Sequence, residues 1–384
     1  MTYRGKLRKQ CTALVGIVGL AVAAVAAPAQ AAPSESPDSV PGFNGTVLAM
    51  AYSGSTIYVG GDFTAAIVKG KTIKRTRLAA VNAYTGELLP WAPAADGRVK
   101  AIATSGSAVY IGGDFGTVGG LTRDSLARID ATSGTVSGTF KHTIDGRPYA
   151  LAAANGRLYV GGTLAKVNGQ TRTRLAAFDL SSGLLDTNWK PTADDQVEAL
   201  ATGAGRVYVG GKFHKINGTS GYDRLVALDP TSASIVTGFT PKPPVIAFAI
   251  AVTADSVYTA HGGQGGTANA YSLAGTKRWT ATFDGDGQAI AALDDTVYVG
   301  GHFDHACLTA RTGDHGVCLD GSDDRVKIAA LDTGDGHLRD WTANANGIEG
   351  VLGMASNPGL GAIAAGGAFT TIGGQPQKRF AQFS

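Results

Sequence analysis

Apolar residues along most of this chain occur in short runs that are separated by glycine and polar turns. One representative stretch has apolar runs at 99–104, 108–115, 126–130 and 135–141. Runs of this length between turn residues are typical of β-strands, and runs without strict alternation indicate strands that are covered on both faces. The pattern therefore predicts a unit of four short strands joined by tight hairpins and one longer polar loop.

This unit recurs seven times, and its most regular feature is a strand that ends in a glycine pair. Numbered 1 to 7 in chain order, the repeats carry Tyr58-Val59-Gly60-Gly61, Tyr110-Ile111-Gly112-Gly113, Tyr159-Val160-Gly161-Gly162, Tyr208-Val209-Gly210-Gly211, Tyr258-Thr259-Ala260-His261, Tyr298-Val299-Gly300-Gly301 and Ala364-Ala365-Gly366-Gly367. Short β units at a period of about 40–50 residues predict a β-propeller. We expect an all-β chain whose residues 41–384 form a single seven-bladed β-propeller of four-stranded blades.

The two ends of the repeat array indicate how the ring closes. Most repeats end with an aromatic residue on the fourth strand: Trp91, Phe140, Trp189, Phe239, Phe283 and Trp341. The last repeat stops after its third strand, whereas 40–45 (Val-Pro-Gly-Phe-Asn-Gly) resembles the fourth-strand segment 89–93 (Leu-Pro-Trp-Ala-Pro). We therefore expect the N-terminal segment to supply the outer strand of the seventh blade.

The first 31 residues have the features of a secretory signal peptide. Basic residues up to Lys9 precede an apolar run over 13–27, and Ala29-Gln30-Ala31 is a small-residue cleavage site. We expect a signal peptide over 1–31 that is cleaved near Ala31, a short linker over 32–40, and a secreted, extracellular protein without a stable membrane anchor. The apolar run is shorter than the roughly 20 residues of a membrane span.

Removing the signal peptide changes the charge balance of the chain. The formal net charge of +3 includes four basic residues and no acidic residue from 1–31, so the remainder is nearly neutral at −1. Nothing else in the sequence indicates the clustered basic residues of a nucleic-acid-binding surface. The 55 glycines also argue against a helical protein, because an interior helical glycine costs about 1 kcal/mol relative to alanine. We expect a monomer that does not bind nucleic acid.

Repeat 6 contains an irregular loop bounded by two cysteines. Ten residues lie between Cys307 and Cys318, and two cysteines in an oxidising compartment most simply form a disulfide. Candidate metal ligands for zinc or copper surround them, namely His302, Asp304, His305, Asp314 and His315. The alternative, which we favour, is a solvated loop held by the disulfide that forms a binding surface specific to this protein.

A second candidate site is a ring of oxygen-bearing side chains. Acidic or amide residues follow the fourth-strand aromatic residue by five positions at Asp96, Asp145, Asp194 and Asn346. Such a ring around a channel mouth could bind calcium through oxygen ligands. The alternative is that these residues cap turns between blades and recur only because the unit recurs. We favour capping and expect no cofactor, with calcium at the channel mouth left open.

Arginines recur before the third strand, and no catalytic constellation is evident. Arg75, Arg123, Arg172, Arg224 and Arg325 could each bind an anion, but their recurrence favours a structural role. The chain contains no G-x-S-x-G or H-E-x-x-H motif. We therefore assign no catalytic residue.

The repeat unit resembles that of a known class of propellers. Its elements are Gly60-Gly61-Asp62-Phe63, an Arg-x-Arg-Leu-Ala-Ala segment at 75–80, an Asx turn at 82–86 and Trp-x-Pro at 91–93. This combination resembles the delta-type repeat β-propellers of unknown function in secreted bacterial proteins, and the strand with the glycine pair is similar, more weakly, to kelch repeats. The resemblance implies an exported propeller domain and implies no catalytic residues.

The function that we expect follows from strand order. In an antiparallel unit, the loops between strands 2 and 3 and those between successive repeats share one face, which we call the long-loop face. Binding residues tend to lie on such loops. We expect a secreted, non-catalytic binding module for a protein or an extracellular glycan, acting through the long-loop face. The alternative is an extracellular carbohydrate-active enzyme, a hydrolase or lyase, that uses carboxylates of this face.

Overall fold

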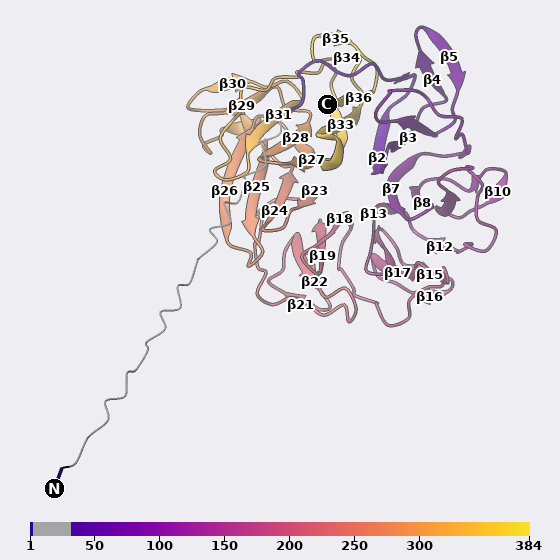
Figure 1. Ribbon diagram of the computed structural model, residues 1–384, viewed down its shortest axis with the longest axis horizontal. Helices are drawn as coiled ribbons and strands as arrows, with labels where there is room; N and C mark the ends of the chain where they lie inside the picture. Colours follow the sequence, from indigo (N-terminus) through magenta and orange to yellow (C-terminus); the bar gives the residue numbers. More distant parts are fainter. Residues whose placement is uncertain (3–31) are drawn as a thin grey trace. The chain divides into compact units, whose positions relative to one another are not determined.

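The computed structural model describes residues 1–2 and 32–384, so the expected signal peptide lies almost entirely outside the described residues. Residues 32–384 form an all-β unit whose sheets are arranged around a central axis (Figure 1). Within this part of the chain the helical segments are two 3₁₀ turns, η1 (Asp314–Gly316) and η2 (Pro358–Leu360). None of the described residues belongs to a helix long and apolar enough to cross a membrane. The predicted all-β propeller fold is confirmed.

Six repeats share one arrangement, in which a second strand pairs antiparallel with a first and a third strand. These strands are β2 (Val47–Ser53), β3 (Thr56–Gly61) and β6 (Leu78–Asn82) in repeat 1; β7 (Val99–Ser105), β8 (Ala108–Gly113) and β11 (Leu126–Asp130) in repeat 2; β13 (Pro148–Ala154), β14 (Arg157–Gly162) and β17 (Leu175–Asp179) in repeat 3; β18 (Val197–Gly203), β19 (Arg206–Gly211) and β22 (Leu225–Leu228) in repeat 4; β27 (Gly287–Leu293), β28 (Thr296–Gly301) and β31 (Ile328–Asp332) in repeat 6; and β32 (Val351–Asn357), β33 (Ala362–Gly367) and β36 (Phe380–Phe383) in repeat 7.

Repeat 5 has a larger sheet of six strands, because a hairpin of repeat 6 extends its outer edge. Its strands in spatial order are β23 (Ala247–Val252), β24 (Ser256–His261), β25 (Gly266–Ser272), β26 (Lys277–Phe283), β29 (His305–Cys307) and β30 (Ser322–Asp324). The hairpin joins the sheet at one residue pair, Phe283 with Ala306. The irregular loop of repeat 6 is therefore attached to the repeat that precedes it.

The prediction of four-stranded blades holds for repeat 5 but is wrong in detail for most other repeats. The apolar run 135–141 was expected to be a strand, but it makes a single bridge between Ile129 and Val136. Repeats 1, 3, 4 and 6 have one equivalent bridge each. In repeat 1, Pro90 lacks an amide donor for a longer ladder.

The polar loop between the second and third strands contains a short hairpin in six repeats. These hairpins are β4 (Ala65–Val68) with β5 (Lys71–Lys74), β9 (Thr117–Val118) with β10 (Leu121–Thr122), β15 (Lys166–Val167) with β16 (Gln170–Thr171), β20 (Lys215–Ile216) with β21 (Thr219–Ser220), β29 with β30, and β34 (Thr371–Ile372) with β35 (Gln375–Pro376). Two further strands, β1 (Gly42–Phe43) and β12 (Ile144–Asp145), pair with β4 and β15. The segment that enters each of these two repeats is thus attached to the hairpin of the same repeat.

Aromatic residues connect each repeat to the next. The ring of Tyr58 packs edge-on against Trp91 at 5.0 Å, and the indole Nε1 of Trp91 donates to the carbonyl of Asp130 in repeat 2 at 2.9 Å. Trp189 makes the equivalent bond to Asp229, and Trp279 to Thr333. In repeat 5 the indole bond is made by Trp279, whereas the predicted aromatic residue, Phe283, lies four residues later on the fourth strand and stacks on Phe303 of repeat 6.

The segment that precedes β1 lies along the last strand of the chain. The amides of Ser34 and Asp38 donate to the carbonyls of Ser384 and Gln382, at 3.2 and 2.8 Å. Trp341 Nε1 donates to the carbonyl of Pro33 at 3.0 Å, as the other tryptophans do to the third-strand turn of the next repeat. Neighbouring first strands contact one another around the axis, and β32 contacts β2.

Deleting 33–40 tests whether these contacts support the fold. The deletion removes at least four hydrogen bonds and leaves the edge of β36 unpaired, and each bond contributes about 1 kcal/mol net. We expect the free energy of unfolding in urea to fall by roughly 3 kcal/mol or more. Trp341→Phe, which removes only the indole donor, should cost about 1 kcal/mol. A deletion variant as stable as the full chain would show that the segment does not support the fold.

Candidate functional site

Each repeat has an irregularity at the same point of its first strand. In all seven, the register between the first and second strands shifts by one residue, as between Val99 and Ala101 in repeat 2. Such a β-bulge leaves one residue unpaired and redirects its side chain. The seven bulged residues are Leu48, Lys100, Tyr149, Glu198, Phe248, Gln288 and Leu352. We call this set the bulge ring.

The bulge ring lines a single hollow at the centre of the seven first strands. All seven side chains are half-buried and border a cavity of about 260 Å³. The next residue of each strand is alanine or glycine, as at Ala101 and Gly353, but the ring itself contains a base, an acid, an amide, two aromatic and two aliphatic side chains. Because bulges are often found beside functional sites, this is the strongest candidate site of the molecule.

The glycine pair accompanies the bulge in six of the seven repeats, and repeat 5 has the bulge with Ala260 and His261 in these positions. A Cβ on Gly61 would overlap the carbonyl oxygen of Thr46, and a Cβ on Gly60 would come within 2.6 Å of Val99 in the next repeat. The carbonyl oxygen of Thr46 accepts a hydrogen bond from the amide of Asp62 at 2.8 Å. The second glycine thus lets the start of the first strand fold back onto the second strand, and the following residue bulges into the channel.

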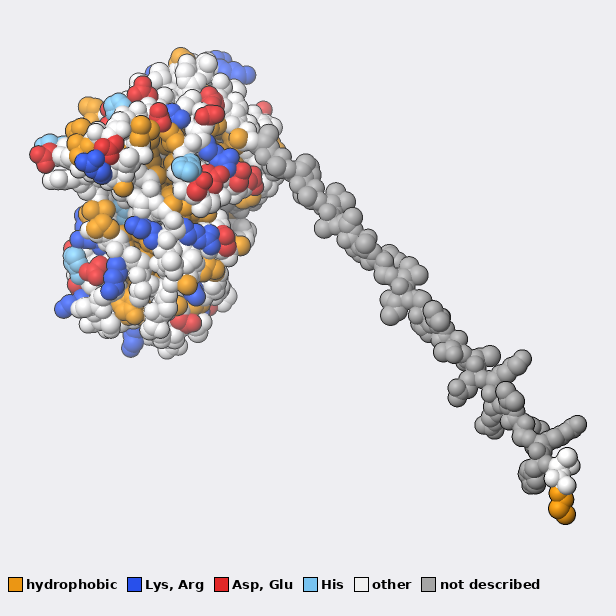
Figure 2. Space-filling model, turned by 90° about the vertical axis from the view of Figure 1, so that its left-hand side faces the viewer, with side chains coloured by type: hydrophobic (Ala, Val, Ile, Leu, Met, Phe, Trp, Pro, Cys, Tyr) orange, Lys and Arg blue, Asp and Glu red, His pale blue; other side chains and the backbone are white. Residues whose placement is uncertain are grey.

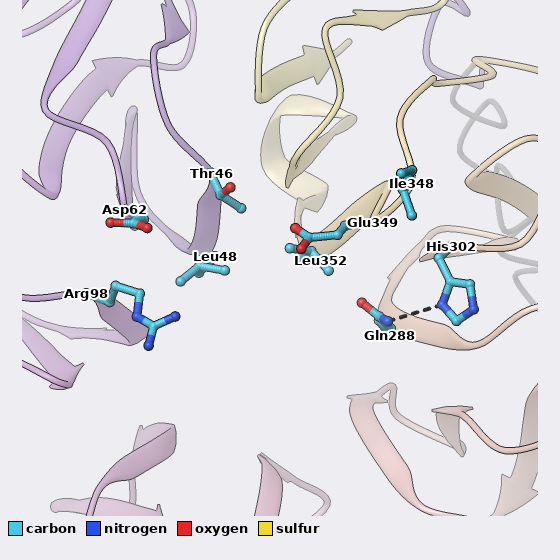
Figure 3. A pocket seen from close by; sticks show the side chains of 9 residues that line it. All are labelled: Thr46, Leu48, Asp62, Arg98, Gln288, His302, Ile348, Glu349 and Leu352. Atoms are coloured by element: carbon cyan, nitrogen blue, oxygen red, sulfur yellow. Dashed lines mark hydrogen bonds between the residues drawn. The ribbon is translucent and has the colours of Figure 1, made fainter.

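A larger hollow of about 560 Å³ adjoins the bulge ring on the long-loop face, and we call it the mouth pocket. Its lining residues are Thr46, Leu48, Asp62, Arg98, Gln288, His302, Ile348, Glu349 and Leu352 (Figure 3). Gln288 Nε2 and His302 Nδ1 are 3.3 Å apart. Ile348 and Glu349 come from a loop before β32 that is two residues longer than its counterpart in repeat 2, and Ile348 is 91% exposed. The pocket therefore combines an aliphatic wall with groups of both charges.

Basic side chains gather on the repeat 2 and 3 side of the mouth. The carboxylate of Asp114 lies 3.3 Å from Arg98 Nε, 3.1 Å from Lys100 Nζ and 3.5 Å from Arg147 Nε. The ammonium of Lys100 also lies 4.4 Å from the ring centroid of Tyr149. We call Arg98, Lys100 and Arg147 the basic cluster. Three cations share one carboxylate, so this side of the mouth carries excess positive charge.

The predicted ring of oxygen ligands is not brought together at a channel mouth. Oδ1 of Asp96 accepts from the amides of Gly116 and Thr117, at 2.8 and 3.0 Å. Burial alone would raise the pKa of Asp96, but these backbone N–H groups outweigh it and lower the pKa. Asp194 and Asn346 bind the equivalent amides of repeats 4 and 7. Each side chain thus secures the hairpin of its own repeat.

Asp145, the remaining member of that predicted ring, lies in β12 opposite Lys166. The same securing role is filled by Asn44 and Asp284. Among residues 1–2 and 32–384, no group of three or more histidine, cysteine, aspartate or glutamate side chains is arranged to hold a metal ion.

The candidate ligands of repeat 6 separate into different environments. His305 Nδ1 lies 2.7 Å from Asp284 Oδ2, and this hydrogen bond raises the pKa of His305 above its usual value. Asp304 forms a 2.7 Å ion pair with Lys327. His302 lines the mouth pocket, whereas Asp314 and His315 lie in η1. The structure therefore assembles no metal site from the five predicted residues.

The predicted disulfide between Cys307 and Cys318 is present, with a Cα–Cα separation of 5.2 Å. Exposed aliphatic residues flank it at Leu308, Val317 and Leu319. Figure 2 views the side of the molecule on which β26, β29 and β30 lie, and hydrophobic, acidic and basic side chains are intermixed there.

Four of the five recurrent arginines donate side-chain hydrogen bonds to main-chain carbonyls of their own repeats. Arg75 donates to Leu89 at 2.6 Å, and Arg325 to Arg339 at 3.0 Å. Arg123 and Arg172 bind the equivalent carbonyls of Ser137 and Asp186. These side chains hold the segment after the third strand in place.

The sequence did not predict the bulge ring, because its seven positions share no residue type. One signal was available in the sequence: at the second position of the first strand the chemistry differs in almost every repeat, while the residues on either side recur.

Three comparisons with known proteins bear on this chain. Residues 153–188 match the model of a family described as a β-propeller domain of unknown function, DUF5122. No curated protein sequence is detectably similar. Among solved structures, the chain resembles the WD40 β-propeller domain of Doa1, with 11% identity, a TM-score of 0.55, and 91% of this chain and 96% of that chain covered. It also resembles a chain of the Mitotic Checkpoint Complex, with 12% identity, a TM-score of 0.62, and coverage of 97% and 98%. The likeness supports the propeller fold.

Repeat 5 departs from the glycine pair, and His261 occupies the second position. Its side chain is fully buried, and Nε2 lies 2.7 Å from the hydroxyl of Thr259. Burial lowers the pKa of His261 to about 4. An unfolded histidine titrates near 6.5, so between these values the unfolded chain binds a proton that the folded chain does not. Stability must therefore fall as the pH drops from about 6.5 to 4.

His261→Gln, which keeps a neutral hydrogen-bonding group, should remove this dependence. Between pH 7.5 and pH 4.5, we expect the native chain to lose roughly 2–3 kcal/mol more unfolding free energy than the variant, as measured by urea denaturation. His337→Gln, at an exposed position, serves as the control and should behave like the native chain. Equal losses in the native chain and in His261→Gln would contradict the assignment.

Proposed function

We propose that this chain is a secreted, non-catalytic binding module that holds a protein partner at the mouth of its central channel. The observation that carries the proposal is the bulge ring: a repeated bulge places seven side chains of six residue types in one hollow. In the proposed architecture the seven repeats are seven blades of a ring, the N-terminal segment closes the seventh blade along β36 with residues 34–38 of the expected linker rather than with 40–45, and the protein acts as a monomer.

The disulfide is the support for secretion. A bond between Cys307 and Cys318 is stable in an oxidising compartment, and the basic and apolar pattern of 1–31 is that of an export signal. We propose that 1–31 is removed and that the mature protein works outside the cytoplasm.

The exposed aliphatic residue Ile348 supports a protein partner. It lines the same pocket as Leu48 and Leu352, and an exposed apolar group within a concave surface is typical of protein-binding sites. The similar structure titled Mitotic Checkpoint Complex is a protein assembly by its name, so assembly with other proteins is compatible with this fold.

The alternative, a carbohydrate-active enzyme, has less support. Asp194 accepts two backbone N–H bonds and Asp304 is paired with Lys327, so neither carboxylate is placed to transfer a proton to a substrate. For the same reason we do not include calcium in the proposal, because the oxygen atoms of Asp96 and Asn346 already bind main-chain amides.

Site-specific photo-crosslinking tests the proposal. Phe248, in the bulge ring, is replaced by p-benzoylphenylalanine, and the full chain is expressed and irradiated in cultures of the organism that produces it. Because the ring is the proposed contact surface, we expect discrete crosslinked proteins, detected by mass spectrometry.

The matched control places the same group at Tyr84, which is 71% exposed on the opposite face. We expect no equivalent product from this position. Crosslinking that is equal at both positions, or absent from Phe248, would overturn the proposal. Crosslinking to glycan alone would favour the glycan alternative and also overturn it.

A further inference from the structure

We infer that the partner presents an acidic polypeptide segment to the basic cluster and inserts a neighbouring aliphatic side chain into the mouth pocket. This inference rests on the proposed function and specifies the chemistry of its partner.

The charge balance of repeats 2 and 3 supports the acidic half of the inference. Arg98 and Arg147 have side chains that are 54% and 49% exposed, and together with Lys100 they face the single carboxylate of Asp114. Arg98 uses Nε for that contact, and its two Nη groups form the fork that binds a carboxylate in a bidentate manner. One further carboxylate from a partner would bring the cluster closer to neutrality.

The position of Lys100 fixes where the incoming acid would lie. Its ammonium is held between Asp114, at 3.1 Å, and the ring of Tyr149, at 4.4 Å. Lys100 and Tyr149 are adjacent members of the bulge ring, so the cluster borders the channel rather than the outer rim. A carboxylate bound there would be partly shielded from water, which strengthens a charge-assisted hydrogen bond.

The mouth pocket supports the aliphatic half. Arg98 lines this pocket together with Leu48, Leu352 and Ile348, so the basic and aliphatic groups belong to one continuous surface (Figure 3). A volume of about 560 Å³ lies within the range of sites that bury a bound group. The acidic residue Glu349 lies on the same wall and disfavours an acid there, and the other acidic lining residue, Asp62, is already paired with Arg77 at 2.6 Å. The partner must therefore carry its acidic groups to one side of its aliphatic anchor.

A polypeptide fits this surface better than other polyanions. A sulfated or uronic-acid glycan would satisfy the arginines, but it carries no aliphatic group for Leu48, Leu352 and Ile348. A nucleic acid would need basic residues along an extended stripe, whereas the excess positive charge here is confined to two repeats.

Selection of a phage-displayed library of random 12-residue peptides on the mature protein tests the inference. We expect the enriched peptides to carry two or more Asp or Glu residues on one side of a Leu, Ile or Met. For a synthetic peptide of the enriched sequence, the double variant Arg98→Ala/Arg147→Ala should raise Kd at least tenfold. The affinity should also fall between 50 and 500 mM NaCl, because the attraction is screened by salt.

The control variant is Lys277→Ala, at an exposed residue at the start of β26 on the opposite face, and it should leave Kd unchanged. Arg98 and Arg147 are half-exposed, so thermal unfolding should be nearly the same in all three proteins. A variant that unfolds early is replaced by Arg98→Gln/Arg147→Gln, which keeps hydrogen-bonding groups without the charge.

Other results separate this inference from the proposed function. Enriched peptides that lack acidic residues and bind through Leu48 and Leu352, tested as Leu48→Ser/Leu352→Ser, would overturn the inference and leave the function standing. Binding of a heparin decasaccharide that depends on the arginines, without peptide enrichment, would overturn the protein partner. Peptides that bind the native protein, the arginine double variant and the leucine double variant with equal Kd would overturn both. The absence of any enriched peptide would also overturn both.

Discussion

The structure depends on the close approach of a carbonyl oxygen to a glycine that has no side chain. In six of the seven repeats, the carbonyl before the first strand occupies the space where a Cβ of the second glycine would lie, as with Thr46 and Gly61. The contact lets the amide after the glycine bond to that carbonyl, at 2.8 Å from Asp62 to Thr46. In repeat 5, where His261 replaces the glycine, the equivalent bond from Gly262 to Ile246 is the longest of the seven at 3.2 Å. The approach accompanies the bulge in six repeats, and repeat 5 keeps the bulge with the longer bond.

Many residues whose side chains could have served binding or catalysis instead hold the repeats together through hydrogen bonds. Trp91 binds a carbonyl of the next repeat, Asp96 binds two amides of its own hairpin, and Arg75 binds the segment after the third strand. Each of these bonds joins a side chain to the backbone of another segment of the chain. Their recurrence is therefore a property of the scaffold, and the differences between repeats are the more informative guide to recognition.

The sequence predicted the features that depend on the spacing of residues close together in the chain. The glycine pairs indicated short strands in repeating sheets, and the separation of Cys307 from Cys318 indicated a disulfide; both are confirmed. The capping role favoured for Asp96 also follows from its recurrence. The single bridge that replaces most fourth strands was not predicted, because the apolar run 135–141 has the same pattern as the runs that do form strands. The bulge ring was not predicted either, since a one-residue register shift leaves Leu48 or Gln288 indistinguishable from ordinary strand residues.

The central claim is that the glycine pair carries the fold while the bulged side chains remain available for recognition. The most direct test compares two substitutions within repeat 2, Gly113→Ala and Lys100→Ala, by the free energy of unfolding in urea. A Cβ on Gly113 would overlap the carbonyl of Arg98, so the account predicts a loss of about 2 kcal/mol or more. Lys100→Ala should cost less than about 1 kcal/mol. A larger loss from Lys100→Ala than from Gly113→Ala would contradict the account.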